Sequence, residues 1–418
     1  MDTFLIRGGR RLEGSLRVDG AKNAVLPIMA AAVLTEDTVT ITGAPAITDA
    51  DNMARILTML GARTQRQGRT LTIDGASVHS WELPDSLSKQ IRSSIFLLGP
   101  VLARFRQATV TFPGGCEIGL RPIDLHLNGL RRLGVAIREE GGMIHCDGSA
   151  MHAGEIHFDY PSVGATENVM MASVLLDGVT RIHNAAREPE IADLQSFLNA
   201  MGARVRGAGG HVIEIEGVKR LHGVTYTPMP DRIVAGTLLC AGAITGGDVT
   251  LTNAPSDDMV AITAKLREMG CRIDESGDML RLRAPERLMA FSQLQTQPHP
   301  GFPTDMQVQM LALLAVSEGT GVIVENVFEN RFTHAGEMNR MGARILCSGR
   351  TAVVQGVKRL YGAHVTARDL RGGAALALAG LKAEGETRVD QAWLIDRGYD
   401  ALENQLAALG ADVRRIQT

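Results

Sequence analysis

The sequence has few cysteines, no excess of positive charge and no long hydrophobic run. Its five cysteines are an odd number at irregular spacing without a CxxC pair, which disfavours a disulfide framework or a zinc site and fits a reducing compartment. The formal net charge of −3 disfavours the basic surface that nucleic acids and membranes require. No run approaches the roughly 18 apolar residues of a membrane span, and the start, MDTFLIRGGRRLEG, does not look like a signal peptide. We therefore expect a cytoplasmic protein with neither a nucleic-acid nor a membrane partner.

The remaining composition is typical of a folded globular protein. Apolar residues make up 45% of the chain and charged residues 21%, which excludes a disordered or fibrous class. A chain of 418 residues is too long for one compact core, so we expect two domains of roughly 200 residues each.

A short phrase recurs six times along the chain, in forms such as LGART at 60 and MGARV at 201. Its glycines are 68 to 73 residues apart and stand at Gly61, Gly134, Gly202, Gly270, Gly342 and Gly410. A period of about 70 residues is too long for the common helical solenoids, so each repeat is expected to be a small αβ unit.

The recurring glycine has a structural explanation. It follows an amphipathic segment such as DLQSFLNAM, so it is expected to end a helix in the left-handed conformation. The residues after it alternate and are rich in Val and Ile, as in ARVRGAGGHVIEIEGV, which predicts a β-hairpin.

Each repeat also contains a segment of apolar and small residues, which is typical of a helix buried on all sides. The six segments are AVLPIMAAAVL from 24, SIFLLGPVLA from 94, NVMMASVLL from 168, IVAGTLLCAGAI from 233, MQVQMLALLAV from 306 and GAALALAGL from 373. Three repeats per domain would enclose three central helices, an inside-out α/β arrangement. The domain border is expected near TPMP at 227–230, and the first strand could pair with either half.

Polar residues gather where these buried helices are expected to begin. Ser162, Asp231 and Asp369 suit N-caps, for which Ser and Asp are common. Lys22 and Arg371 oppose the helix dipole unless an anion such as phosphate or carboxylate binds there. If the helices of each domain are parallel, their starts converge, and two such ends would form a cleft for an anionic ligand between the domains.

The segment PGGCEIGLRPID at 113–124 places a thiol in a polar, glycine-rich loop. Such a loop is a candidate lid, and Arg121 together with backbone amides would favour a reactive Cys116. The other four cysteines fit apolar helices or strands, so we expect them to be buried small hydrophobes. His126 is two residues past Asp124 in an amphipathic helix and is expected to be a satisfied polar residue rather than a base.

Several motifs together resemble the UDP-N-acetylglucosamine 1-carboxyvinyltransferases, enolpyruvyl transferases of peptidoglycan synthesis. In chain order they are VDGAKNAVLPIMAAAVL, PGGCEIGLRPIDLH, PSVGATENVMMA, NAAREPEI, PHPGFPTDMQ, FENRF, DLRGG and IDRGY. They extend from the first strand to the last helix, so the resemblance covers essentially the whole chain.

The resemblance implies an α/β fold of two inside-out, barrel-like domains, each with three repeated units, buried central helices and an active site in the interdomain cleft. The first domain would be 22–229, with the Cys116 lid, and the second 1–21 plus 230–418. It also implies the reaction: phosphoenolpyruvate gives its enolpyruvyl group to the 3-hydroxyl of UDP-N-acetylglucosamine and phosphate leaves, with these two small molecules as substrates and no cofactor or metal.

The same resemblance implies roles for individual residues. Cys116 would be the proton donor on the lid, open to alkylation by epoxide analogues of phosphoenolpyruvate, and Asp305 would meet the sugar hydroxyl. Lys22, Arg121 and Arg397 match donor-binding positions, and Asn23 would hold an oxygen of the substrate or intermediate. The other expected substrate contacts are Arg92, Pro122, Ile123, Asp124, Leu125, Ser162, Val163, Gly164, Val327, Arg331, Asp369 and Arg371.

Two positions depart from the family pattern. Tyr160 stands where some members have lysine near the diphosphate, and Glu117 follows the cysteine where a small residue is common. Three alternatives stay open at this point: a shikimate-phosphate enolpyruvyl transferase, a non-catalytic nucleotide-sugar-binding paralogue, and a ring-like clamp that binds nucleic acid or protein. The RPIDL and PSVGATEN segments disfavour the first, and the net charge of −3 disfavours the clamp.

Overall fold

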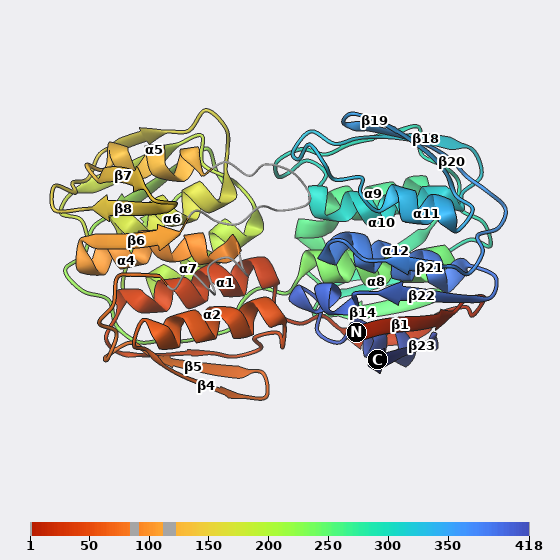
Figure 1. The fold of residues 1–418 in the computed structure, drawn as a ribbon, viewed down its shortest axis with the longest axis horizontal. Helices are drawn as coiled ribbons and strands as arrows, with labels where there is room; N and C mark the ends of the chain where they lie inside the picture. The colour runs from red at the N-terminus through yellow and green to blue at the C-terminus, as the bar shows by residue number, and fades with distance from the viewer. Residues whose placement is uncertain (1, 84–91, 112–122, 418) are drawn as a thin grey trace. The chain divides into compact units, whose positions relative to one another are not determined.

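The computed structural model describes residues 2–83, 92–111 and 123–417 (Figure 1). These residues form two compact units. Unit N comprises the described residues of 20–229, and unit C comprises residues 2–19 with 230–417. Both units have the predicted α/β class and the predicted inside-out arrangement, with buried helices surrounded by sheets and outer helices.

Each unit contains three copies of one arrangement: a central helix, a strand, an outer helix and a hairpin, except that a single strand follows the outer helix of the sixth copy. The central helices are α1 (Lys22–Ala31), α4 (Leu98–Phe105), α6 (Val163–Ser173), α8 (Arg232–Thr245), α10 (Thr304–Ala315) and α12 (Leu370–Lys382). The outer helices are α2 (Thr48–Met59), α5 (Asp124–Arg132), α7 (Pro189–Ala200), α9 (Val260–Glu268), α11 (Ala335–Arg340) and α13 (Leu402–Ala408). Short 3-10 helices are η1 (Ala32–Leu34), η2 (Arg92–Leu97), η3 (Ser256–Met259) and η4 (Ala392–Arg397).

The strands form one small sheet per repeat. In unit N, the strand order in the first sheet is β13 (Thr225–Tyr226), β3 (Thr38–Ile41), β5 (Thr70–Asp74), β4 (Arg63–Gln67). The order in the second sheet is β6 (Gln107–Thr111), β8 (Met143–Asp147), β7 (Ala136–Glu140). The order in the third sheet is β11 (Arg204–Arg206), β12 (Val212–Glu216), β10 (Val179–His183), β9 (Glu155–His157). In unit C, the strand order in the first sheet is β15 (Arg272–Ser276), β16 (Met279–Arg283), β14 (Asp248–Thr252), β2 (Glu13–Arg17). The order in the second sheet is β17 (Gln293–Gln295), β18 (Thr320–Val324), β20 (Thr351–Gln355), β19 (Arg344–Ser348). The order in the third sheet is β21 (His364–Thr366), β22 (Glu386–Asp390), β1 (Asp2–Arg7), β23 (Asp412–Gln417).

Strand pairing closes each unit into a ring of repeats. In the four-stranded sheets of the first five repeats, the strand before the outer helix pairs antiparallel with a hairpin strand and parallel with a strand from the neighbouring repeat. In unit N, β13 at the end of the third repeat pairs with β3 of the first. In unit C, β2 pairs with β14 of the fourth repeat, and β1 joins the sheet of the sixth.

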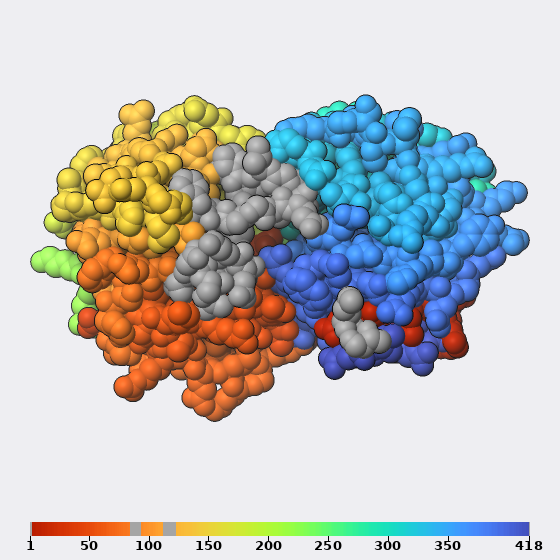
Figure 2. Space-filling model, in the orientation of Figure 1, coloured from red at the N-terminus to blue at the C-terminus, as the bar shows by residue number. Residues whose placement is uncertain are grey.

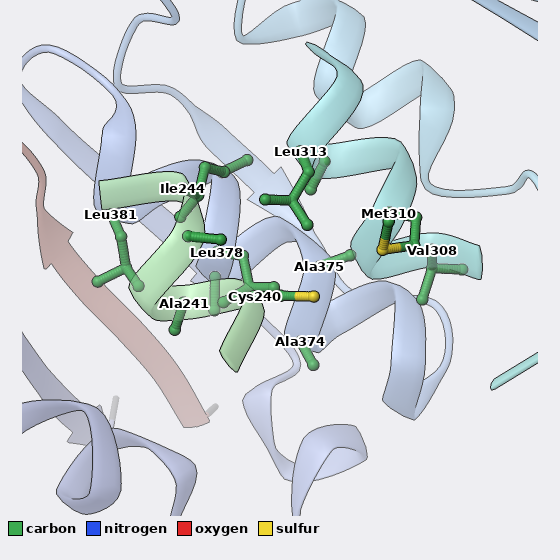
Figure 3. Packing of buried hydrophobic residues seen from close by; sticks show 14 of the residues in the cluster. Cys240, Ala241, Ile244, Val308, Met310, Leu313, Ala374, Ala375, Leu378 and Leu381 are labelled. Carbon is green, nitrogen blue, oxygen red and sulfur yellow. The ribbon is translucent and has the colours of Figure 1, made fainter. Parts of the chain in front are cut away.

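The central helices are buried because nearly every side chain on them is apolar or small. In α10 every residue from Met306 to Ala315 is buried, as predicted for a helix that is apolar on all sides. Figure 3 shows how Cys240 of α8, Met310 of α10 and Leu378 of α12 meet in the core of unit C. Glycine permits this close packing, since a Cβ added at Gly236 would lie 2.7 Å from the Met306 Cε. None of the described helices combines the length and apolarity needed to cross a membrane.

The six recurring glycines end the six outer helices as predicted. Their φ angles lie between +86° and +106°, in the region that residues with a Cβ rarely adopt. After α2, the Gly61 N–H donates to the Thr58 carbonyl at 3.0 Å and the Ala62 N–H to the Leu57 carbonyl at 2.9 Å, which is a Schellman motif. The same pair of hydrogen bonds recurs at the other five glycines, so one local motif starts every hairpin.

The first strand belongs to unit C, as the family resemblance implied. β1 pairs antiparallel with β22 on one side and with β23 on the other, and the red atoms of the early residues lie among the blue atoms of the last ones (Figure 2). Phe4 and Ile6 face the core and are fully buried. β1 therefore takes the place that the second hairpin strand has in the other repeats.

Three of the four described cysteines match the expectation of buried thiols, and one does not. Cys146, Cys240 and Cys271 are buried, and burial raises the pKa of the Cys146 and Cys271 thiols to about 12. Cys347 is exposed, so its prediction was wrong. It lies in β19, two residues before the turn at Gly349, where the last three residues of the strand are exposed.

Candidate active site

The predicted site residues gather at the starts of the central helices. Ser162 of α6, Asp231 of α8 and Asp369 of α12 are N-caps whose side chains accept backbone N–H groups of the first turn. This satisfies donors that a helix start leaves without partners. Lys22 and Asp305 differ, because each lies inside the first turn of its helix and not at the capping position.

Lys22 begins α1 and is paired with a buried acid. Its Nζ lies 2.8 Å from Asp49 Oδ2, and the two side chains are 10% and 1% exposed. Asp49 lies in the first turn of α2, where negative charge is favourable, and it supplies the counter-charge for a cation at the positive end of α1. The half-buried Asn23 follows Lys22. Asp49 is not among the site residues that the sequence predicts.

A second group in unit N joins the start of α5 to the start of α6. Ile123 is buried, Asp124 is exposed and Leu125 lies partly buried against the core. The half-buried Val163 and Gly164 form the first turn of α6 after the Ser162 cap. A Cβ at Gly164 would lie 2.8 Å from the Cε1 atom of His126, so the glycine lets the two helices approach closely.

His126 is a satisfied polar residue, as predicted. Its Nδ1 lies 2.8 Å from the Asn168 Nδ2, and both side chains are buried. The same amide donates to the Ile95 carbonyl at 2.9 Å and accepts from the Gly99 N–H at 2.7 Å. Asn168 thus connects α6 to α5 and to the η2–α4 segment, and it fixes the starts of the elements that carry the predicted nucleotide-sugar contacts.

Four predicted site residues are described incompletely or not at all. Cys116, Arg121 and Pro122 lie outside the described residues, as does Glu117. Arg92 opens η2, but its side chain is also outside the description. Their roles therefore remain predictions from the sequence.

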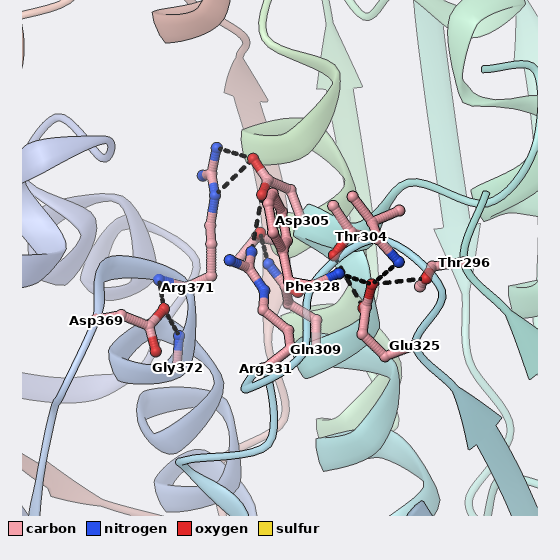
Figure 4. A network of polar contacts seen from close by, with 12 residues as sticks. Thr296, Thr304, Asp305, Gln309, Glu325, Phe328, Arg331, Asp369, Arg371 and Gly372 are labelled. Atoms are coloured by element: carbon pink, nitrogen blue, oxygen red, sulfur yellow. Dashed lines mark hydrogen bonds and ion pairs between the residues drawn. The ribbon is translucent and has the colours of Figure 1, made fainter. Parts of the chain in front are cut away.

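In unit C, Asp305 lies between two buried arginines (Figure 4). Its Oδ1 accepts from Arg331 Nη2 at 2.8 Å, and its Oδ2 accepts from Arg371 Nη2 at 3.0 Å and Nε at 3.3 Å. Both arginine side chains are 2% exposed, whereas that of Asp305 is 24% exposed. Two guanidinium groups at hydrogen-bond distance stabilise a negative charge on Asp305. The structure thus brings together three of the predicted site residues.

Arg371 remains charged in spite of its burial. Burial acts to lower the pKa of its guanidinium, but Tyr399 and the nearby acids Asp305 and Asp231 outweigh it and raise the pKa above the usual value. The guanidinium carbon lies 5.1 Å from the centre of the Tyr399 ring, a distance suited to a cation–π contact. Asp369 accepts the backbone N–H of Arg371 at 3.0 Å, so the cap fixes the residue's backbone as well.

The loop after β18 carries Val327 and Arg331, and one buried carboxyl group organises it. Glu325 is fully buried, and its Oε1 accepts the N–H groups of Val327 at 2.8 Å and Phe328 at 3.1 Å. The Arg331 guanidinium carbon lies 5.6 Å from the centre of the Phe328 ring. Sequence reasoning missed Glu325. The available signal was an acid directly after the apolar strand GVIV, where the third and fourth repeats have asparagine.

His334 is a second buried residue that sequence reasoning missed. It lies at the start of α11 and is 2% exposed. Burial lowers the pKa of its imidazole to about 4; Asp369 acts to raise it and Arg331 to lower it further. The imidazole is therefore neutral above that pH, next to two of the predicted site residues.

Arg397 ends η4. Its neighbour Asp396 accepts from Arg415 Nη1 at 2.7 Å and Nη2 at 2.5 Å. Arg415 lies on β23 and also donates from Nε to Glu403 at 2.8 Å. This ion-pair network fixes the end of η4 against the sheet and hence the backbone of the half-buried Arg397.

Within the part of the chain that the structure describes, no cluster of three or more His, Cys, Asp or Glu residues is placed to hold a metal ion. The charged groups that the described residues bring together are an acid that pairs with two arginines in unit C and a lysine that pairs with an acid in unit N. Such groups bind anions and move protons.

Comparison with known proteins assigns these groups to a family. The sequence model of the family described as EPSP synthase (3-phosphoshikimate 1-carboxyvinyltransferase) matches residues 6–406. A protein of Caldanaerobacter subterraneus named UDP-N-acetylglucosamine 1-carboxyvinyltransferase 2 is 50% identical over 416 residues, which cover 100% of both chains. UDP-N-acetylglucosamine 1-carboxyvinyltransferase 1 of Symbiobacterium thermophilum is 52% identical over 421 residues, 99% of this chain and 95% of its own length.

Solved structures agree with this relationship. The enolpyruvyl transferase NikO from Streptomyces tendae superposes with a TM-score of 0.90 at 26% identity and covers 100% of this chain and 99% of its own. EPSP synthase from Acinetobacter baumannii covers 100% of both chains with a TM-score of 0.75 at 17% identity, which supports the fold alone. The chain therefore belongs to the UDP-N-acetylglucosamine 1-carboxyvinyltransferases, within the wider family of enolpyruvyl transferases that share the EPSP synthase fold.

Proposed function

We propose that this protein transfers the enolpyruvyl group of phosphoenolpyruvate to the 3-hydroxyl of UDP-N-acetylglucosamine and releases phosphate, the first committed step of peptidoglycan synthesis. The observation that carries the proposal is the sequence identity of 50% and 52%, over 100% and 99% of this chain, to two relatives that are named for this activity. The EPSP synthase description of the family model names a different acceptor, but the full-length relatives favour the nucleotide sugar.

The donor carries a phosphate and a carboxylate, so its binding requires cations. We assign this task to Lys22, Arg121 and Arg397, with Arg331 and Arg371 as further positive charges. The Lys22–Asp49 contact of 2.8 Å supports the assignment, because it orients the ammonium group at the start of α1. Asn23 has a side-chain amide that can hold an oxygen of the substrate or intermediate.

The reaction consists of an addition followed by an elimination. In the addition, the sugar 3-oxygen bonds to C2 of the donor, Asp305 receives the hydroxyl proton, and Cys116 delivers a proton to the methylene carbon C3. In the elimination, the C2–phosphate bond breaks, phosphate leaves, and a proton is lost from the methyl group that C3 has become. The partly exposed Asp305 carboxylate between two buried guanidinium groups supports its role, since its position is fixed before the substrate binds.

The acceptor carries a uridine, a diphosphate and a sugar. We assign its contacts to the Ile123–Leu125 segment with Arg92, Arg121 and Pro122, to Ser162–Gly164 at the start of α6, and to Val327 and Asp369. The start of α6 supports a role in phosphate binding because the helix dipole favours an anion there. Tyr160, at the position where the family resemblance implies a lysine in some members, is 42% exposed just before this helix.

The experiment that tests the proposal is phosphate release from phosphoenolpyruvate, with UDP-N-acetylglucosamine and with shikimate-3-phosphate in parallel. We expect release with the nucleotide sugar alone. Release with shikimate-3-phosphate alone would identify the protein as a shikimate-phosphate enolpyruvyl transferase. Release with neither acceptor, despite binding of the nucleotide sugar, would identify it as a non-catalytic paralogue. The proposal also places the enzyme in the cytoplasm, which fits the free thiols of the four described cysteines.

A further inference from the structure

The carboxyl group of Glu325 connects the loop after β18 to the start of α10. Its Oε1 accepts from the Thr296 hydroxyl at 2.8 Å in addition to the Val327 and Phe328 N–H groups. Its Oε2 accepts from the Thr304 hydroxyl at 2.9 Å. Thr304 is the first residue of α10 and the neighbour of Asp305. A fully buried group with four donors and no exposed surface has a fixed position.

The corresponding residues of other repeats show which part of this network the sheet itself requires. Asn184 in the third repeat and Asn253 in the fourth also follow directly on the strand before the outer helix. Each donates from Nδ2, at 2.7 Å, to the backbone carbonyl of the residue after the parallel strand, Phe158 and Val18 respectively. An asparagine therefore suffices to join the two strand ends. Glu325 makes the corresponding contact with Thr296 and, in addition, reaches the start of the central helix.

Two routes lead from Glu325 to Asp305. The first is the Thr304 hydroxyl, which fixes the first turn of α10. The second runs through the Phe328 N–H: the Phe328 ring lies 5.6 Å from the Arg331 guanidinium, and Arg331 donates to Asp305 Oδ1 at 2.8 Å (Figure 4). Both the acid and one of its two arginines are thus held to the same buried carboxyl group.

We propose that Glu325 is a positioning residue for the reaction: it fixes the Asp305–Arg331 pair and the Val327 backbone in the geometry that turnover requires. This inference rests on the proposed function, because it takes Asp305 as the group that meets the sugar hydroxyl. It goes beyond that function by assigning a role to a residue that touches neither substrate.

The test compares variants of the full chain by steady-state kinetics and thermal unfolding. Glu325→Leu removes all four acceptor contacts, and because misplacement of a reacting group by about 1 Å costs ~100-fold, we expect kcat to fall by about that factor. The KM for UDP-N-acetylglucosamine should rise because the Val327 backbone moves, and the KM for phosphoenolpyruvate should rise because Arg331 moves. Glu325→Gln keeps one acceptor oxygen, and its NH2 group can donate to Thr304 after the hydroxyl rotates, so kcat should stay within about threefold.

A second variant keeps the proposal testable if Glu325→Leu does not fold. Thr304→Val removes only the contact to Oε2 and should lower kcat about tenfold. Thr245→Val is its matched control, since that hydroxyl at the end of α8 donates to the Ala241 carbonyl at 2.8 Å. Asn253→Ala is the control for Glu325→Leu, because it removes the corresponding strand contact of the fourth repeat. Both controls should lower the Tm and leave kcat unchanged.

The outcomes separate this inference from the proposed function. If Glu325→Leu and Thr304→Val lower the Tm but leave kcat and both KM values unchanged, as expected for the controls, Glu325 has a structural role only. A Glu325→Gln variant as inactive as Glu325→Leu would also overturn the proposal, because the hydrogen-bond network would then not be what matters. If the wild-type protein does not release phosphate with the nucleotide sugar, both proposals are wrong. If only the variants lose activity, the proposed function stands and the result bears on the role of Glu325.

Discussion

At the starts of α1 and α10, a charged side chain is held by buried partners of opposite charge, but the sign of the charge differs between the two helices. In unit N, a lysine at the helix start is neutralised by one buried acid, Asp49. In unit C, an aspartate at the helix start is held by two buried arginines, Arg331 and Arg371. The acid agrees with the helix dipole and the lysine opposes it, so the lysine depends more on its partner. Repeats of one design thus provide a fixed cation in one unit and a fixed acid in the other.

The same contrast extends to one buried titratable group in each unit. In unit C, burial lowers the pKa of His334 to about 4. In unit N, burial raises the pKa of Glu167 well above its ordinary value, and the nearby Glu190 and Glu188 add to the shift. Burial thus favours the neutral form of both groups, which is a base in one unit and an acid in the other.

The largest effect is expected from removing the acid of unit C. Asp305→Asn eliminates the proposed proton acceptor, and kcat should fall about 1000-fold, in the range of general acid–base contributions. The measurement is phosphate release under saturating substrates. Asp274→Asn, at an acid of an exposed ion pair with Arg283, is the control and should keep full activity. A kcat within tenfold of wild type for Asp305→Asn would mean that another group takes the proton.

The next effect comes from removing the counter-charge of Lys22. Asp49→Asn leaves a buried ammonium without its carboxylate, which should lower the free energy of unfolding by about 3–5 kcal/mol. Denaturant unfolding gives the value, and Asp51→Asn in the same turn is the matched control. Asp51 is 54% exposed in its contact with Arg66, so its removal should cost less than about 1 kcal/mol. Equal losses for the two variants would show that the burial of the Lys22 pair has no energetic consequence.

His334 should make the protein less stable as the pH falls. An unfolded histidine takes up a proton near pH 6.5 and the folded one near pH 4, so between these values the unfolded state binds more protons. Stability is therefore fully present above about pH 6.5 and is lost towards pH 4, by about 3 kcal/mol in total. The slope of the unfolding free energy between these pH values should decrease in His334→Gln. An unchanged slope would assign the pH dependence to other groups.

Glu167 should act in the opposite direction. Its folded pKa lies above its unfolded value, so the folded state holds the proton longer and stability falls as the pH rises above about 4.5. Glu167→Gln, which needs no proton, should match the wild type at pH 4 and exceed it by a margin that grows towards pH 8. Thermal unfolding across this range measures the margin, and a margin that shrinks with rising pH would contradict the assignment of a neutral Glu167.

The local features of this fold could be read from the sequence, and the contacts between elements could not. The six glycines were predicted as helix ends because a left-handed residue after an amphipathic segment is a local requirement. The buried helices were predicted from their apolar composition. The pairing of Lys22 with Asp49 has no such signal, since it depends on how α1 and α2 pack. Glu325 was missed for the same reason: its four donors come from three separate segments.

The exposure of Cys347 was mispredicted on similar grounds. Alternation along β19 identifies strand residues, but the exposure of Cys347 depends on its place near the end of the strand, where the last three residues are exposed. The roles of Cys116 and Arg121 came only from the family resemblance, since a reactive thiol requires a charge environment that residue spacing does not specify.

The position of β1 has a consequence for the synthesis of the chain. β1 is made long before its two partners, β22 at 386–390 and β23 at 412–417. Until the ribosome has released those residues, a strand with Phe4 and Ile6 on one face has no sheet to join, and unpaired strands of this kind are prone to aggregate. Unit N, whose residues are made in one stretch, can complete its ring in the meantime. The sheet that contains β1 therefore cannot be completed before the last strand has left the ribosome.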